Sequence, residues 1–183
     1  MKKKVFLVFL LFVICGPVFP QIKVVSFKKL QQFLPSVELK GFTRQKPTGM
    51  TQNTMGMATS QSSVEYAPKP PEKETDSANT ASIKITIQDA TLMPYMLAQF
   101  AMLQQGYESE SESGYEKALT VQNKYPGKLS CQTGDYKSCK IEFGVMNRFL
   151  LQLEGSNFSD PALLYQLIDK MDLENLAKVE ADK

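Results

Sequence analysis

The feature that most constrains the fold is strict alternation of apolar and polar residues in two segments. The alternating apolar positions are Ile83, Ile85, Ile87, Ile141, Phe143 and Val145. Successive side chains of a strand point to opposite faces, so this spacing gives each segment one apolar and one polar face. The pattern predicts strands that are half-buried against a hydrophobic core.

Short polar turns connect several of these segments. Residues 133–135 separate segments 129–131 and 138–145, and Met146 and Asn147 precede the apolar segment 149–153. Turns of this length join antiparallel neighbours. The sequence therefore predicts a three-stranded meander.

Cys131 and Cys139 flank the first of these turns, with seven residues between them. Their separation in sequence is even, so a hairpin places both side chains on the same face. In an oxidising compartment, cysteines at this spacing are expected to form a disulfide.

Three helices are predicted. The first begins at Ser26 and ends before Pro35, the second covers residues 92–105, and the third begins at Pro161. Together these patterns predict an α+β domain over residues 22–183. We expect an antiparallel sheet of about five to seven strands with the N-terminal, central and C-terminal helices packed against it. Residues 68–79 hold three prolines and no large apolar residue, and are expected to form a surface loop.

The first 21 residues resemble a secretory signal peptide. Lysines at positions 2–4 precede an apolar run over residues 5–15. That run is shorter than the roughly 20 residues that a spanning helix needs, so we expect no stable membrane span. Lipidation of Cys15 is the weaker interpretation, because bulky Ile14 precedes it. The chain is expected to be exported to the periplasm or secreted.

Charge and composition exclude several classes of function. The whole chain has 21 basic and 19 acidic side chains, and removal of the signal peptide takes away three lysines and no acid. Nucleic acid is therefore not an expected partner. The absence of histidine removes the commonest general base. We predict that the protein is not an enzyme and binds no cofactor, and a carboxylate-based hydrolase is the remaining enzymatic alternative.

The predicted helix over residues 92–105 is apolar on nearly all sides. Met93, Met96, Phe100 and Leu103 are the candidate surface for a ligand or partner, because flexible methionines adapt to varied apolar shapes. The competing interpretation is that these side chains pack on the strand at residues 83–87. The leading hypothesis is a non-catalytic binding or accessory domain that engages an envelope protein or an apolar small molecule near this helix.

Two further groups suggest metal sites. Met50, Met55 and Met57 offer thioether ligands that suit cuprous copper, although gap-filling methionines are the commoner case. Glutamates at positions 108, 110 and 112 alternate with serines, a pattern more typical of a solvated connection than of a calcium loop.

The C-terminal half resembles a known group in its organisation. Tyr125-Pro126-Gly127 is followed by residues 140–146, the segment RFLLQLEG at residues 148–155 and a helix after Asp160. This order resembles small exported bacterial proteins of unassigned function with a PsbP-like, helix-flanked antiparallel sheet. The resemblance implies a non-enzymatic accessory or binding module and assigns no site residues.

Overall fold

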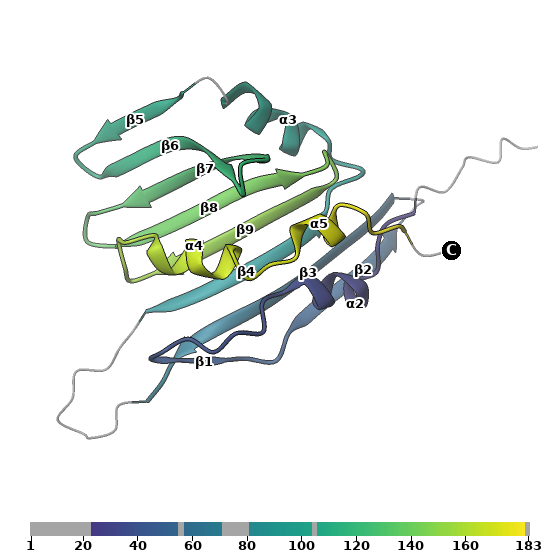
Figure 1. Ribbon diagram of the computed structural model, residues 1–183, viewed down its shortest axis with the longest axis horizontal. Coiled ribbons are helices and arrows are strands. Elements are labelled where there is room, and N and C mark those ends of the chain that lie inside the picture. The colour runs from purple at the N-terminus through teal and green to yellow at the C-terminus, as the bar shows by residue number, and fades with distance from the viewer. Residues whose placement is uncertain (1–22, 55–56, 71–80, 104–105, 182–183) are drawn as a thin grey trace, which may run out of the picture.

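The computed structural model describes residues 23–54, 57–70, 81–103 and 106–181. Over these residues the chain forms one antiparallel sheet of nine strands with four short α-helices (Figure 1). The strands are β1 (Phe42–Arg44), β2 (Thr48–Thr54), β3 (Met57–Pro68), β4 (Ser82–Asp89), β5 (Glu108–Ser111), β6 (Gly114–Val121), β7 (Tyr125–Gln132), β8 (Ser138–Val145) and β9 (Phe149–Ser156).

The strand order is β1-β3-β4-β9-β8-β7-β6-β5, and β2 pairs with β3 beyond the end of β1. Strands β6 to β9 form a continuous meander, which confirms and extends the predicted three-stranded unit. Strand β4 crosses back to pair with β9, so the segment at residues 83–87 lies in the middle of the sheet. This central position buries all three isoleucines completely.

The two faces of the sheet differ in chemistry. The apolar face carries Ile83, Ile85 and Ile87 and the residues opposite them, and it forms the main core. The polar face carries Lys84, Thr86 and Gln88 and the residues opposite them. Burial of a large aliphatic side chain contributes about 1.5–3 kcal/mol, so the apolar face supplies most of the stability.

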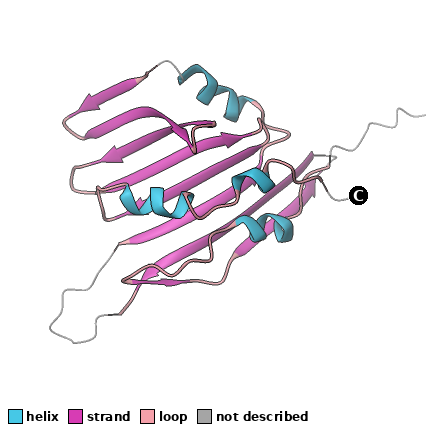
Figure 2. Ribbon diagram, in the orientation of Figure 1, coloured by secondary structure: helices cyan, strands magenta, loops and turns pink. Residues whose placement is uncertain are grey.

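Helices α2 (Phe27–Leu30), α4 (Ala162–Ile168) and α5 (Leu173–Leu176) cover the apolar face. Figures 1 and 2 show all three in front of the sheet. These helices complete the main core with six buried side chains: Leu30, Leu164, Leu167, Ile168, Leu173 and Leu176. Each helix has only one or two turns.

Helix α3 (Tyr95–Met102) packs on the opposite, polar face. Leu97 and Phe100 form a second, smaller core with Ala90 and Leu150. Gly144 lies beneath them, and a methyl group on it would meet Leu97 at 3.2 Å. Because Gly144 has no side-chain carbon, helix α3 can approach the sheet closely at this position.

The predicted number of strands was wrong, because the sheet has nine strands rather than five to seven. Two of the additional strands are β2 and β5, whose residues are exposed throughout. Both lie at edges of the sheet, so neither needs the apolar alternation by which the inner strands were recognised. These two segments are strands because their backbones pair with a neighbouring strand. Their own side-chain pattern does not indicate that pairing.

The predicted arrangement of three helices packed together against the sheet was also wrong. The N-terminal helix is a single turn that continues as the 3-10 helix η1 (Gln31–Phe33), and the C-terminal helix divides into α4 and α5. Asp172 begins α5 by accepting a hydrogen bond from the backbone N–H of Asn175 at 3.1 Å. The central helix is shorter than residues 92–105 and lies on the other face.

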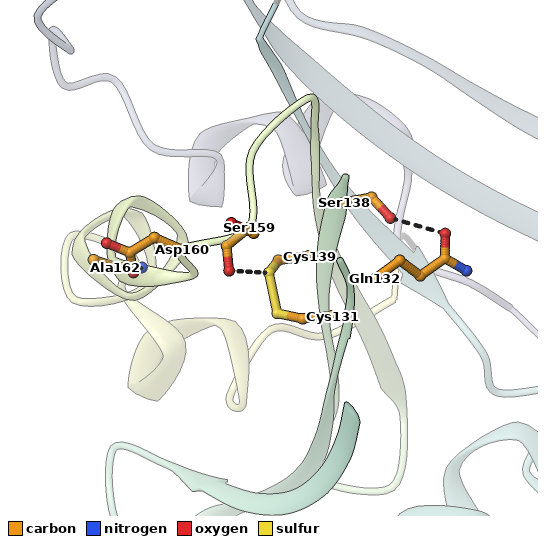
Figure 3. Close-up of a disulfide and its surroundings, with 7 residues drawn as sticks. All are labelled: Cys131, Gln132, Ser138, Cys139, Ser159, Asp160 and Ala162. Carbon is orange, nitrogen blue, oxygen red and sulfur yellow. Dashed lines mark hydrogen bonds between the residues drawn. A yellow bond between two sulfur atoms is a disulfide. The ribbon is translucent and has the colours of Figure 1, made fainter. Parts of the chain in front are cut away.

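The predicted disulfide between Cys131 and Cys139 is confirmed. The two residues are directly opposite on β7 and β8, and Figure 3 shows their sulfurs on the side that faces α4, with Gln132 and Ser138 on the other side. The Sγ atom of Cys139 lies 3.2 Å from the carbonyl oxygen of Ser159. An oxidised sulfur carries no proton, so this is a close sulfur–oxygen contact.

Some predictions fall outside the described residues. The signal peptide at residues 1–21 does so entirely, and the loop at residues 68–79 does so mostly. Within the described ranges, no helix has the length and apolar character to cross a membrane.

Candidate functional site

The polar face carries a row of charges that alternates in sign across the sheet. Glu65 lies opposite Lys84, Lys84 opposite Glu154, and Glu154 opposite Lys140. Opposite charges on directly paired residues stabilise their register. This row therefore helps to align four strands while presenting polar groups to the solvent.

Hydrogen bonds extend this row toward β6. Lys140 forms an ion pair of 2.9 Å with Glu142, which also accepts a hydrogen bond of 2.6 Å from the side-chain amide of Gln152. Lys128 forms an ion pair of 3.2 Å with Glu116. The charges here are largely paired with each other, so the face offers directional polar groups and little net charge.

Glu116 has the most perturbed carboxyl group on this face. The hydroxyl of Ser130 donates a hydrogen bond to its Oε1 atom at 3.0 Å, and this bond lowers the pKa of Glu116 below its usual value. Partial burial raises the pKa, and Lys128 and Tyr107 lower it further. A general base needs a pKa near the working pH, so a carboxyl group held ionised in this way is poorly suited to acid–base catalysis.

Hollows lie along the polar side of the sheet, and three of them are lined by residues that the structure describes. One of ≈ 290 Å³ is lined by Ser109, Ser111, Ser113, Glu116, Ser130 and Gln132. A second of ≈ 350 Å³ lies near Lys46, Glu65 and Lys84, and a third of ≈ 170 Å³ lies beside Met50 and Gln88. Their linings are mainly hydroxyl, amide and charged groups, which suits polar contacts.

The structure places the predicted surface residues of the central helix mostly on its inner side. Phe100 is only 1% exposed, and Met96 and Leu103 pack against the small core beneath the helix. Met93 lies half-buried in the turn before the helix. The helix packs mainly on β7, β8 and β9 of the polar face, rather than on the isoleucine face of the strand at residues 83–87 that the competing interpretation named.

Sequence reasoning missed the exposed apolar residues on the outer side of α3. Tyr95 is 71% exposed and Met102 is 84% exposed. They are seven residues apart, which places them on the same side of a helix, with Ala98 between them. The seven-residue spacing is visible in the sequence. It identifies an exposed side of the helix only once the opposite side is known to pack against the sheet.

The methionines proposed to bind copper are not brought together as neighbours among the described residues. Met50 is 51% exposed and lies opposite Gln61, whereas Met57 is 64% exposed and lies opposite Thr54. Four residues along β3 separate these two positions, which corresponds to about 13 Å. Met55 lies outside the described residues.

The predicted polar connection at residues 108–112 is instead mostly strand β5. Glu110 lies opposite Tyr115, and Ser109 and Ser111 border the serine-lined hollow. Over the described ranges, no group of three or more histidine, cysteine, aspartate or glutamate side chains is arranged to hold a metal ion.

Comparison with known proteins returned no relatives. No family model matches the chain, and neither a curated protein nor a solved structure is significantly similar to it. The resemblance to the PsbP-like group therefore stays a prediction.

Proposed function

We propose that this protein is an exported, non-catalytic binding module that docks a partner protein on the polar face of its sheet. The outer side of α3 supplies the apolar anchor of this interface. The exposure of Tyr95 and Met102 on one side of the helix is the observation that carries the proposal.

The anchor has the composition of an interface hot spot. Aromatic residues and methionine are enriched at protein interfaces, and tyrosine is among the residues that contribute most to binding. Ala98, one helical turn from Tyr95, is small and exposed, so a partner side chain can approach the helix between Tyr95 and Met102. Leu97 and Phe100 hold the helix on the sheet, so this ridge is presented in a fixed position.

The polar face around the anchor provides the groups expected at the rim of an interface. Lysine, glutamate, serine and glutamine side chains project from β4, β9, β8 and β7 beside the helix. Their mutual pairing leaves little net charge, which favours a protein partner over a polyanion. The hollows along this face have polar linings and suit hydrogen-bonding groups better than an apolar small molecule.

Four observations support the absence of catalysis and the export of the chain. The sequence contains no histidine. The pKa of Glu116 is lowered, whereas a carboxyl group that acts as a general base near neutral pH needs a raised pKa. The disulfide between Cys131 and Cys139 suits an oxidising compartment, in line with the charged and apolar segments at residues 1–21.

Site-specific photocrosslinking in the producing cell tests this function. A photoreactive phenylalanine analogue placed at Met102 should crosslink to one discrete partner. The same analogue at Tyr136, which is also 84% exposed but lies in the turn between β7 and β8, is the matched control. The substitution Tyr95→Ser should remove the Met102 adduct without lowering the melting temperature. Equal adducts from both positions, or none from Met102, would contradict the proposal.

A further inference from the structure

The sheet has two free edges, and they differ in how they are protected. Strand β5 ends the sheet on one side, and β1 and β2 lie along the other. An edge strand exposes unpaired backbone N–H and C=O groups that can pair with another strand. Natural proteins protect such edges with charge, proline or short length.

The β5 edge is protected. It has only four residues, and Glu108 and Glu110 alternate along it. A second strand with similar charges would meet these glutamates, and like charges directly opposite each other are destabilising. Two copies of this chain would therefore not pair through β5.

The β2 edge has none of these protections. It has seven residues, no charged side chain and no proline, and every position is exposed. All seven residues pair with β3 without interruption, from Thr48 opposite Ser63 to Thr54 opposite Met57. In the described part of the chain, no strand pairs with its outer side.

The edge is also held rigidly. The hydroxyl of Thr51 lies 2.8 Å from the hydroxyl of Ser60 and accepts a hydrogen bond of 2.8 Å from the backbone N–H of Phe27. The ring of Phe27 lies against Gly49, where a methyl group would meet it at 2.8 Å. A preorganised strand loses little conformational freedom on pairing, which favours association.

We propose that β2 of one copy pairs antiparallel with β2 of a second copy, joining the two sheets into one. The interface of a twofold dimer is self-complementary, so the axis passes beside Thr51 and that residue pairs with itself. Met50 then lies opposite Gln52 of the partner subunit, and Thr48 lies opposite Thr54 of the partner subunit. Each pair is uncharged, and threonine pairs are favourable across strands.

The composition of β2 favours a second copy over a different protein as the occupant. A partner selected by charge would require a charged residue on the strand, and residues 48–54 include none. The dimer leaves α3 free, because that helix packs on β7, β8 and β9 on the other side of β4. This inference is therefore independent of the proposed function.

Sedimentation of the purified protein tests the dimer. We expect a reversible dimer in the range of about 1 to 100 µM. The double substitution Met50→Lys and Gln52→Lys places a lysine of one copy opposite a lysine of the other at two positions of the interface. This repulsion should raise the dissociation constant about tenfold or more. Ser109→Lys with Ser111→Lys on β5 is the matched control and should leave the dimer unchanged. A monomer throughout this range would overturn the proposal, and so would a dimer that only the β5 variant weakens.

Mixed disulfide formation tests the register and does not depend on how the lysine variants fold. Protein with Met50→Cys is mixed with protein with Gln52→Cys and oxidised, and the linked peptides are mapped. The expected product links position 50 of one copy to position 52 of the other and exceeds the product of either variant alone. Equal yields from the mixture and from the separate variants would contradict the register about Thr51.

Discussion

The guanidinium of Arg148 donates a hydrogen bond of 3.0 Å to the Oδ2 atom of Asp89, and this ion pair connects both ends of the described chain to the sheet. The same oxygen accepts the backbone N–H of Val25 at 2.8 Å, and Arg148 donates to the carbonyl oxygen of Val179 at 3.2 Å. Asp89 ends β4, and Arg148 immediately precedes β9. The two adjacent strands thus meet the N-terminal and C-terminal segments at one point.

We predict that Asp89→Ala lowers the free energy of unfolding by about 3–5 kcal/mol, because it leaves a partly buried arginine without its partner. It also leaves the N–H groups of Val25 and Thr91 without their acceptor. Urea denaturation of both proteins measures the loss. Asp135→Ala is the control, because Asp135 is exposed and its loss should change stability by less than about 0.5 kcal/mol. Equal effects of the two substitutions would contradict the role of the ion pair.

A second prediction separates the inner and outer sides of α3. Phe100→Ala should destabilise the protein by about 3–5 kcal/mol, since the ring is fully buried against the sheet. Met102→Ala should change stability by less than about 0.5 kcal/mol, since its side chain is exposed. Thermal unfolding of both variants checks the difference. A large loss in Met102→Ala would mean that the outer side of α3 is covered within this chain.

A third prediction concerns the disulfide. Reduction of the Cys131–Cys139 bond should lower the free energy of unfolding by about 2.5 kcal/mol, because a small loop in the unfolded chain is released. Urea denaturation with and without a phosphine reductant measures the change. Protein in which both cysteines are alanine is the control and should not respond to the reductant. We expect the far-ultraviolet circular dichroism to stay the same, since β7 and β8 remain paired by their backbone.

A fourth prediction concerns the pKa of Glu116. Ser130→Ala removes the largest cause of its lowered pKa, so the carboxyl group should titrate at a higher pH in an NMR titration. Ser109→Ala is the control. Ser109 lies directly opposite Glu116, but among the described residues no hydrogen bond joins their side chains. A Glu116 pKa that is unchanged in Ser130→Ala would contradict the assignment.

The lowered pKa of Glu116 also sets the sign of its pH dependence. Its folded pKa is below its unfolded pKa, so its stabilising effect is present above the unfolded pKa and is lost as the pH falls through the folded pKa. The side chain is 40% exposed, so solvent screening limits this effect to a few tenths of a kcal/mol. The stabilities of wild type and Glu116→Gln should therefore converge at low pH.

A fifth prediction tests the packing over Gly155. A methyl group added there would overlap the ring of Phe158, so Gly155→Ala must displace that ring from its place against the core. We expect a loss of about 1–3 kcal/mol by urea denaturation. Gly134→Ala is the matched control, because open space surrounds Gly134. A neutral Gly155→Ala would show that Phe158 can move away without cost.

The inner strands and the disulfide were predictable because their information is local. Alternation at Ile83–Ile87 and Ile141–Val145 requires one buried face wherever the strands lie in the sheet. The even spacing of Cys131 and Cys139 around a short turn places both sulfurs on one side of the hairpin. Both features depend only on residues that are close together in the sequence.

The ion pair between Asp89 and Arg148 could not be predicted in the same way. The two residues are 59 positions apart, and the pairing of β4 with β9 brings them together. Arg148 follows a turn, where a charged residue usually faces the solvent. Only the pairing of β4 with β9, with both terminal segments packed beside these strands, brings the two residues together.

Sequence alone thus determined the half-buried strands, the turns between them and the disulfide, since each depends on side chains only a few residues apart. Tertiary structure decided the two polar edge strands, which exist because a neighbouring backbone pairs with them. It also decided which side of α3 faces the sheet. That helix has apolar residues on both sides, so burial of Leu97 and Phe100 against Leu150 and Gly144 is what leaves Tyr95 and Met102 exposed.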